Sequence, residues 1–446
     1  MFELNKNTDY VALEKKYVFG TWRQQRSWNP LLIEEAAGCY FTDINGKKYL
    51  DFSSQLMCSN LGHKSPKVIN TLSKQANKLC YIAPSFATIP AAKLGEKLAA
   101  ITPGDLQKTF FSLGGAEANE AAIKIARMYT GKTKLISRYR SYHGATSGAI
   151  SLTGDPRTHY AVGIPGIIRA PDCYCYRCPL GKEYPNCDIS CAEYIDEIIK
   201  MEGKQNIAGI VVEPIVGSNG ILVPPKEYIP RLREICDERE LLLIDDEVMT
   251  GFGRTGTWFC IEHWNVVPDI MSMAKGLTGA FIPLGATIVK KKIADFFDEE
   301  GNLFCHGHTY STHALCCAVA LTAIQEYIDN NLIEHVKQVG VTLGKRLHEL
   351  KEEHKSIGEV RGKGFFWGVE LVKNQTTKEP FVTRSQKFLP NTLKKISAAS
   401  IEKGVYIVNV INTLIIAPPL IADMEQIDEG IRVLGEVLKI ADKECM

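Results

Sequence analysis

Alternation between helix-like and buried strand-like segments along residues 64–325 restricts the fold more than any other feature. Helical apolar spacing is expected at 67–79, 91–101 and 118–129. Short apolar runs lie between or after these segments, namely KLISR, IAGIVVE, LLLID, DIMSMA and GATIVK. Strands that are apolar throughout are typical of sheets covered on both faces. The pattern therefore predicts an α/β fold with a large, doubly wound, mostly parallel sheet.

The two ends of the chain have a different pattern. Near the start, CYFTDINGKKYLDF has two strand-like runs around Asn45-Gly46, a strong hairpin signal. After about residue 330, amphipathic helices at 332–355 and 393–403 accompany the short strands in FFWGVEL, VYIVNV and TLIIAPP. We expect three parts: an N-terminal segment (1–63), a large domain (64–328) and a small α+β domain (329–446) against which the N-terminal segment packs.

Charge and hydropathy restrict the partners. The 446 residues include 52 Lys and Arg against 51 Asp and Glu, a formal net charge of +1. This balance favours neither a nucleic acid nor a membrane surface as partner. No apolar run reaches the roughly 18–20 residues of a membrane span, and the start, MFELNKNTDYVALEKK, lacks the apolar core of a secretory signal. We expect a cytoplasmic protein with small-molecule partners.

Chemically suggestive residues follow several of the expected strands. Asp246 comes after LLLID, and Lys275 comes after DIMSMA. Ligands of open α/β sheets bind at the carboxyl ends of the strands. The glycines of SLGGAE open an alanine-rich helix, whose free N–H groups suit a phosphate, and Tyr142 supplies an aromatic ring. A phosphate cradle, a lysine, an acid and a ring are what pyridoxal 5′-phosphate (PLP) requires.

The segment GFGRTG at 251–256 matches the dinucleotide pattern G-x-G-x-x-G, but its context is wrong. A dinucleotide fingerprint joins a strand directly to a helix. Here several residues separate the glycines from LLLID, and the aromatic segment TWFCIEHW follows. We interpret the match as accidental.

Four separated motifs resemble the class III (ω-amino acid) aminotransferases of PLP fold type I: LGGAEANEAAIK, YRSYHGA, IDDEVMTGFGRTG and MAKGLTGAFIPLGA. HGHTYSTHALCCAVA and IIAPPL support the resemblance, which runs from about residue 28 to the end. Within the family, the chain looks most similar to transaminases of taurine- and β-alanine-type donors. The resemblance implies the cofactor PLP, a ping-pong amino transfer, and a homodimer or dimer of dimers with shared active sites.

The resemblance also implies roles for individual residues. Lys275 matches the lysine that forms the Schiff base, and Asp246 the acid beneath the pyridine nitrogen; these two are the expected catalytic residues. Thr309 matches a threonine given to the phosphate of the neighbouring subunit. The expected cofactor-binding set is Gly115, Ala116, Tyr142, His143, Glu213, Asp246, Val248, Lys275 and Thr309.

Departures from the family pattern bear on the substrate. Met249 stands where many relatives have a glutamine, and Ser218 where some have a gating glutamate. Ile415 replaces an arginine for the α-carboxylate, and Met57 replaces a pocket tryptophan. With Met57 and Ile415 in the substrate pocket, we expect a β- or ω-amino donor resembling β-alanine or taurine, or a β-aminoacyl-CoA thioester. The acceptor is expected to be 2-oxoglutarate or pyruvate, held by one of Arg23, Arg26, Arg138, Arg140 and Arg361.

Two alternatives remain at this point. A PLP-dependent aminomutase, racemase or epimerase would use the same cofactor motifs, and a zinc- or nucleotide-binding regulator would use the cysteines or GFGRTG. We assign no metal ligand in the active site. Elsewhere, a cysteine cluster could bind zinc or an iron–sulfur cluster, or it could belong to an ordered loop without metal; its members are Cys173, Cys175, Cys178, Cys187 and Cys191.

Overall fold

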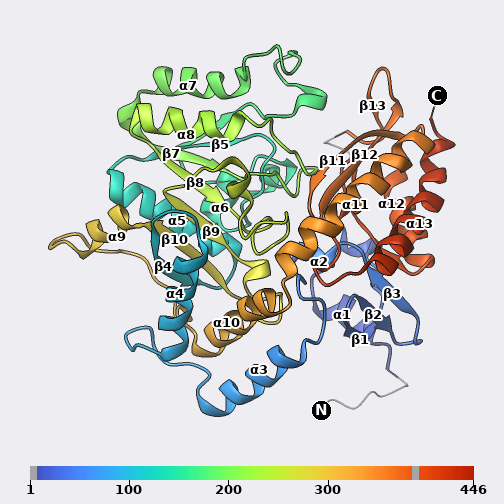
Figure 1. The fold of residues 1–446 in the computed structure, drawn as a ribbon, viewed down its shortest axis with the longest axis horizontal. Coiled ribbons are helices and arrows are strands. Elements are labelled where there is room, and N and C mark those ends of the chain that lie inside the picture. Colours follow the sequence, from blue (N-terminus) through green and yellow to red (C-terminus); the bar gives the residue numbers. More distant parts are fainter. Residues whose placement is uncertain (1–7, 384–390, 446) are drawn as a thin grey trace.

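Seven strands form the large sheet at the centre of the computed structural model, which describes residues 8–383 and 391–445 (Figure 1). In spatial order they are β4 (Leu106–Ser112), β10 (Gly285–Lys290), β9 (Ile270–Met273), β8 (Leu242–Asp246), β7 (Ile207–Val212), β5 (Lys134–Arg138) and β6 (Ile167–Ala170). The strands from β9 to β6 pair in parallel, whereas β10 is antiparallel to both β9 and β4. Strand β4 therefore points the same way as β9. The predicted α/β class with a mostly parallel sheet is confirmed.

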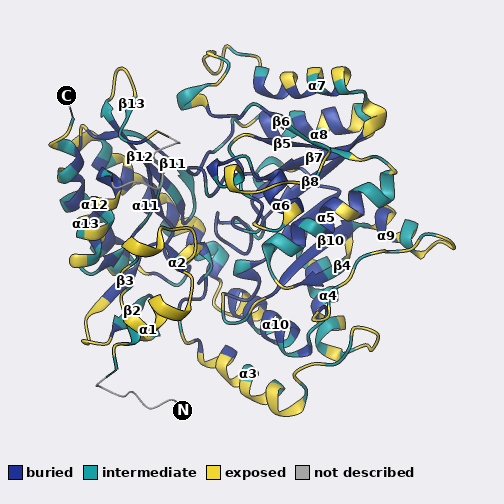
Figure 2. Cartoon of the chain, turned by 180° about the vertical axis from the view of Figure 1, so that it is seen from behind, coloured by how far each residue is buried: buried dark blue, intermediate teal, exposed yellow. Residues whose placement is uncertain are grey.

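Apolar runs form the inner strands because both faces of the sheet are covered. Every residue of β7 and β8 is buried. Helix α5 (Gly115–Thr130) packs across β10, β9 and β8. The outer strands and faces are covered by further helices, namely α4 (Ile89–Ile101), α6 (Ser147–Leu152), α7 (Ser190–Glu202), α8 (Tyr228–Arg239) and α9 (Lys291–Asp298). Figure 2 shows buried residues on the central strands and exposed residues on the outer side of α7.

The C-terminal sheet lies beside the large one (Figure 1). Its strands are, in order, β11 (Ile357–Lys363), β12 (Phe366–Asn374), β16 (Thr413–Ile416) and β15 (Val408–Val410), with β13 (Glu379–Pro380) paired to β12. The accompanying helices are α11 (Leu332–Glu353), α12 (Thr392–Glu402) and α13 (Met424–Asp442). Helices α11 and α12 lie where the spacing predicts them. Helix α13 was not among the expected elements, although its start has a capping box from Asp423 and Gln426.

The N-terminal sheet joins the two ends of the chain. The predicted hairpin forms, with β2 (Tyr40–Asp43) pairing with β3 (Lys48–Asp51) and β1 (Ile33–Ala37) on the outside. Strand β14 (Val405–Tyr406) then pairs in parallel with β3. The run VYIVNV, expected as one strand, thus divides between β14 and β15, which belong to different sheets. The boundaries at 63 and 328 remain a prediction.

The remaining helices are α1 (Tyr10–Tyr17), α2 (Ser54–Met57), α3 (Pro66–Lys78) and α10 (Ala314–Asp329). Helices α3 and α4 lie within two residues of the predicted 67–79 and 91–101. Among the described residues, no helix combines the length and hydropathy needed to span a bilayer. Residues 1–7, on which part of the argument about a secretory signal depends, lie outside the described residues.

Candidate active site

The carboxyl ends of four neighbouring parallel strands bring the main candidates together. Asp246 is the last residue of β8, and Glu213 follows β7 directly. Tyr142 lies in the loop after β5, and Lys275 lies just beyond β9. These strands are adjacent in the order β9, β8, β7 and β5, so their ends meet at one edge of the sheet. This edge is where open α/β sheets bind their ligands.

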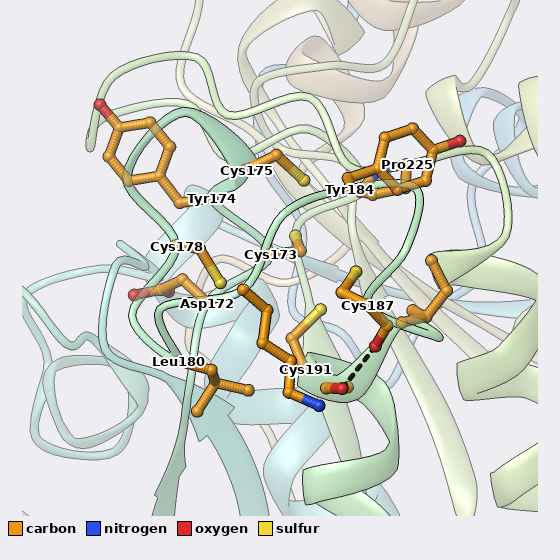
Figure 3. Close-up of a pocket in the computed structure, with 13 residues that line it drawn as sticks. Asp172, Cys173, Tyr174, Cys175, Cys178, Leu180, Tyr184, Cys187, Cys191 and Pro225 are labelled. Atoms are coloured by element: carbon orange, nitrogen blue, oxygen red, sulfur yellow. Dashed lines mark hydrogen bonds between the residues drawn. The ribbon is translucent and has the colours of Figure 1, made fainter.

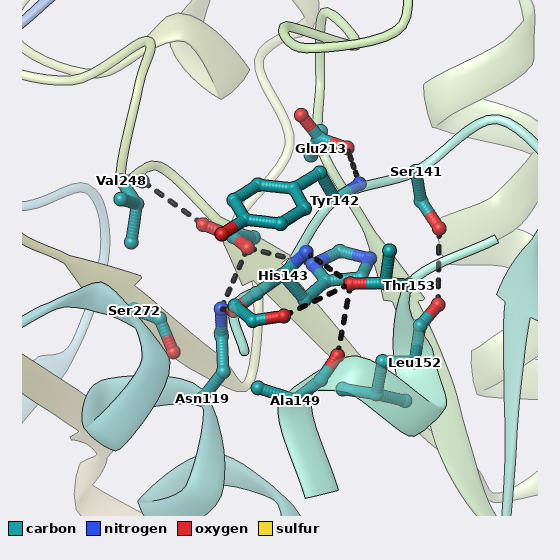
Figure 4. A network of polar contacts seen from close by, with 12 residues as sticks. Asn119, Ser141, Tyr142, His143, Ala149, Leu152, Thr153, Glu213, Val248 and Ser272 are labelled. Atoms are coloured by element: carbon teal, nitrogen blue, oxygen red, sulfur yellow. Dashed lines mark hydrogen bonds and ion pairs between the residues drawn. The ribbon is translucent and has the colours of Figure 1, made fainter. Parts of the chain in front are cut away.

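Three segments supply hydrogen-bond partners to the carboxylate of Asp246. These partners, Asn119, His143 and Val248, are labelled in Figure 4. Asn119 Nδ2 donates to Oδ2 over 2.8 Å, and the backbone N–H of Val248 donates to Oδ1 over 3.0 Å. His143 Nδ1 lies 2.6 Å from Oδ2. These contacts fix the orientation of a carboxylate that is only 3% exposed. A fixed anion at this depth suits a cationic ring nitrogen.

The start of α5 has the backbone N–H groups expected of a phosphate cradle. Gly114 is the N-cap, so the N–H groups of Gly115 and Ala116 lie in the first helical turn and have no partner within the helix. A Cβ on Gly115 would lie 2.6 Å from Val248 Cγ1, so only glycine lets the backbone approach Val248 this closely. Free N–H groups at a helix N-terminus bind phosphate. The residues at this edge of the sheet therefore fit PLP.

Glu213 links two loops of the site. Its Oε1 accepts the N–H of Tyr142 over 3.0 Å, and its Oε2 accepts the N–H of Gly217 over 2.8 Å. Burial raises the pKa of this carboxyl, opposed by nearby His143. Because both oxygens bind backbone groups, Glu213 positions the loop that presents the Tyr142 ring.

Lys275 combines a strained backbone with a perturbed amine. Its φ is +41°, a value that L-residues rarely adopt and that persists only where the surroundings enforce it. Burial lowers the pKa of the ammonium group, and the positive charge of Arg157 acts in the same direction; Cys58, Asp246 and Glu213 oppose them. A lowered pKa increases the neutral amine, which is the form that attacks a carbonyl.

Arg157 is a candidate that the sequence analysis missed. Its Cζ lies 3.6 Å from the centroid of the Tyr142 ring and 5.3 Å from that of Trp22. Asp155 holds the guanidinium through Nε, at 3.0 and 2.8 Å, and through Nη2. No sequence motif marks this arginine, because only the folded loop brings it over the ring.

The expected substrate-pocket residues lie in one apolar cluster. Met57, Met249 and Ile415 pack together, and Ile415 is fully buried in β16. A Cβ on Gly217 would lie 2.1 Å from Met249 Sδ, so this loop depends on glycine. The structure thus joins three positions that are far apart in the sequence, all of them apolar.

Thr309 is the one exposed residue of the expected cofactor-binding set. It is exposed on this chain, and its carbonyl oxygen accepts the hydroxyl of Tyr81 over 2.8 Å. The suggestion that it serves the neighbouring subunit remains a prediction.

Two of the five arginines proposed for the acceptor already have protein partners. Arg138 is buried and donates to the carbonyl oxygen of Glu213 over 2.6 Å. Arg361 binds Glu359, Glu370 and the carbonyl oxygens of residues 220 and 221. Arg23 and Arg26 are exposed, and Arg140 stacks on Tyr174.

The segment GFGRTG has a structural role that differs from nucleotide binding. It folds as consecutive turns after β8. Arg254 within it is fully buried and donates to Ser54 Oγ over 3.0 Å and to Asn60 Oδ1 over 2.6 Å, as well as to carbonyl oxygens of Phe365 and Pro418. The motif therefore ties the large sheet to both the N-terminal and C-terminal segments.

All five residues of the cysteine cluster line one small cavity of about 20 Å³ (Figure 3). Burial raises the pKa of Cys173, that of Cys175 to about 11 and that of Cys191 to about 12. These thiols are therefore protonated at neutral pH. Within residues 8–383 and 391–445, no three Cys, His, Asp or Glu side chains are arranged to hold a metal ion. As they lie, the thiols pack as small apolar groups.

Comparison with known proteins agrees with the geometry of the site. The family model for class III aminotransferases matches residues 23–438. Taurine–pyruvate aminotransferase of Bilophila wadsworthia is 36% identical over 434 residues, covering 94% of this chain and 95% of the relative. Leucine/methionine racemase of Thermococcus litoralis is 37% identical over 424 residues, covering 94% and 92%.

A solved structure is equally similar. Taurine:2-oxoglutarate aminotransferase of Bifidobacterium kashiwanohense, in complex with PLP and glutamate, superposes with a TM-score of 0.93 at 36% identity, covering 99% of both chains. The family match and the fold agree. The chain belongs to the class III aminotransferases and is a PLP-dependent transaminase.

Proposed function

We propose that this transaminase moves the amino group of a β- or ω-amino compound to a 2-oxo acid by ping-pong chemistry. The donor resembles β-alanine or taurine, or is a β-aminoacyl-CoA thioester, and the acceptor is 2-oxoglutarate or pyruvate. The observation that carries the proposal is Arg157, a cation over Tyr142 that acts on the pKa of Lys275. Asp155 binds its Nε and Nη2, so Nη1 is the atom through which Arg157 would offer an acid group a partner at a distance from the reacting amine.

The apolar cluster of Met57, Met249 and Ile415 supports the same donor class. An acid group placed against these side chains would lose its hydration without gaining a partner, which costs several kcal/mol. A donor whose acid is separated from its amine by an extra carbon can instead direct that acid to Arg157. The taurine transaminases among the relatives act on a donor of this kind by their names.

Each residue of the site has a separate role in the proposed reaction. PLP, when bound, supplies an electrophilic carbonyl carbon and an electron sink. Asp246, held by Asn119, Val248 and His143, would keep the ring nitrogen protonated. The amine of Lys275 would take the proton from the substrate carbon and deliver it to the cofactor's former carbonyl carbon. Gly115 and Ala116 would bind the phosphate, and Tyr142 would contact the ring.

We also propose a cytoplasmic homodimer, or a dimer of dimers, in which Thr309 reaches the phosphate of the adjoining subunit. Its exposure on the single chain supports this placement, because an exposed hydroxyl is accessible to a second copy.

A comparison of half-reaction rates tests the donor class. The holoenzyme is mixed with one donor at a time, and the change in cofactor absorbance is followed. The rates with β-alanine, taurine and a β-aminoacyl-CoA are compared with the rates with ordinary α-amino acids. We expect fast conversion with at least one β- or ω-amino donor. Faster conversion with α-amino acids other than glutamate and alanine, the products of the two acceptors, would contradict the proposal.

A racemase is the second candidate, because the Thermococcus relative bears that name. A racemase interconverts enantiomers without a 2-oxo acid. Incubation of single L-amino acids with the holoenzyme, followed by chiral chromatography, distinguishes the two. We expect no D-enantiomer to form without an acceptor.

A further inference from the structure

A second cavity lies between the large and C-terminal sheets, and none of its lining residues belongs to the cofactor site. Its volume is about 240 Å³. Arg140, Tyr174, Arg177 and Asn219 line it from the large-sheet side, and β12, β13 and the segment 410–413 line it from the other. The space is large enough for a molecule of amino-acid size.

Asn219 has hydrogen-bonding atoms that no described residue uses. The residue is only 3% exposed, and neither Oδ1 nor Nδ2 has a partner among the described residues. A buried amide without partners is costly, and native structures rarely keep one without a ligand or water to satisfy it. Because Asn219 lines the cavity, a bound molecule can satisfy both atoms.

The arginines around the cavity add further donors. Arg177 donates from Nε to Glu370 Oε1 over 2.7 Å and from Nη1 to the carbonyl oxygen of Lys378, whereas its buried Nη2 has no partner in the described chain. Arg140 stacks on Tyr174, and its Nε lies 3.8 Å from Asp172 Oδ2, too far for a direct hydrogen bond.

Among the described residues that line the cavity, Glu370 is the one carboxylate, and its oxygens already accept hydrogen bonds. They accept Arg177 Nε, Arg361 Nη1 and the hydroxyl of Tyr174. The unused groups facing the cavity are therefore mainly donors, with Asn219 Oδ1 as an acceptor. A carboxylate matches the donors, and a neighbouring hydroxyl or ammonium matches the acceptor.

From these contacts we infer that the cavity is a second binding site, for a small carboxylate-bearing molecule, separate from the cofactor site. The loops that line it also shape the active site. Arg140 is two residues from Tyr142, and Asn219 is two residues after Gly217, whose N–H binds Glu213. A ligand here is thus positioned to act on the loop that Glu213 holds. The inference does not depend on which amino donor the enzyme uses.

Calorimetry on blocked holoenzyme tests the site. Aminooxyacetate first reacts with the cofactor, and the loss of visible absorbance confirms that the active site is closed. Glutarate, which has neither an amino nor an oxo group to react, is then titrated. We expect one glutarate per chain. The absorbance reports whether the cofactor reacts, and the heat of titration reports whether glutarate binds in the cavity. Failure of the proposed function therefore appears in a different measurement from failure of this inference.

Asn219→Leu is the decisive variant. The leucine removes two unpartnered atoms, so the melting temperature without ligand should stay the same or rise. Glutarate affinity should fall about tenfold or more, and Arg177→Gln should also weaken it. Asn77→Leu, at an exposed position on α3, should bind as the wild type does. No binding by the wild type, or unchanged binding by Asn219→Leu, would overturn the inference.

Discussion

At the scale of single residues, the proposed chemistry depends on the amine of Lys275, whose pKa burial lowers. Lys275→Ala removes that amine. We expect turnover to fall on the order of 10³-fold or more, while PLP is still retained in part by the contacts of Asp246 and the start of α5. Lys291→Ala, which removes a surface lysine paired with Asp295, should leave turnover unchanged. If Lys275→Ala had the wild-type turnover rate under steady-state conditions, Lys275 would not be the catalytic lysine.

Arg157 makes a prediction about pH. Its positive charge helps to lower the pKa of Lys275, so Arg157→Gln should raise that pKa. The neutral amine then becomes scarcer at any given pH. As the pH is lowered, the rate at which the apoenzyme takes up PLP should fall because the amine becomes protonated. In this variant the fall should begin at a higher pH than in the wild type. Arg157→Lys keeps the charge and should lie between them. Superimposable pH profiles for all three would show that Arg157 does not act on Lys275.

The sequence predicted those site residues that adjoin a recognisable strand end or motif. Asp246, Glu213 and Lys275 follow apolar runs whose carboxyl ends had to meet, and the structure brings them together. Arg157 and Asn119 were missed for a physical reason. Both act through contacts that only the folded chain makes: Arg157 over the ring of Tyr142, 15 positions away, and Asn119 on Asp246, 127 positions away. Local spacing contains no signal for such pairs.

At the scale of elements, the close packing of α13 on the N-terminal segment can be tested with glycines. A Cβ on Gly430 of α13 would lie 2.4 Å from the ring of Phe52, whereas a Cβ on Gly95 of α4 would meet nothing within 4 Å. Gly430→Ala should destabilise the protein by about 1–3 kcal/mol through overpacking. Gly95→Ala should stabilise it by about 0.5–1 kcal/mol through helix propensity. Opposite shifts in melting temperature are expected; equal shifts would contradict this packing.

The sequence predicted helices and strands correctly where all residues of a segment belong to one sheet or one helix. The apolar strands of the large sheet and the stripe on α5 follow directly from local periodicity. The run VYIVNV shows the limit. Its six residues have the character of one strand, but Val405 and Tyr406 pair with β3 while Val408–Val410 pair with β16. The choice of partner depends on the N-terminal hairpin, which lies more than 350 residues earlier.

At the scale of the whole molecule, residues far apart in sequence close the structure around the site. Ser53 Oγ donates to the carbonyl oxygen of Ile415 over 2.7 Å and accepts the N–H of Val408 over 3.0 Å. Arg254 links the same N-terminal region to the large sheet. Both ends of the chain are therefore needed to form the apolar cluster around Met57 and Ile415.

The shared site proposed for the dimer predicts complementation. Lys275→Ala and Thr309→Ala should each be impaired alone. In a hybrid dimer, one site combines an intact Lys275 with an intact Thr309 from the other subunit. Unfolding and refolding an equal mixture should therefore recover up to about a quarter of wild-type activity, since half of the dimers are hybrids with one good site each. No recovery, with dimers confirmed by light scattering, would contradict a phosphate site shared between subunits.

The central claim, that this chain transfers nitrogen from a β- or ω-amino donor to a 2-oxo acid, has one direct measurement. The holoenzyme is incubated with ¹⁵N-labelled donor, β-alanine or taurine, and with unlabelled 2-oxoglutarate or pyruvate, and the products are followed by NMR. The account predicts ¹⁵N-labelled glutamate or alanine in proportion to the donor consumed, and no net donor conversion beyond a single turnover when the oxo acid is omitted. Continued conversion of an amino acid without any oxo acid, with its nitrogen retained, would contradict it.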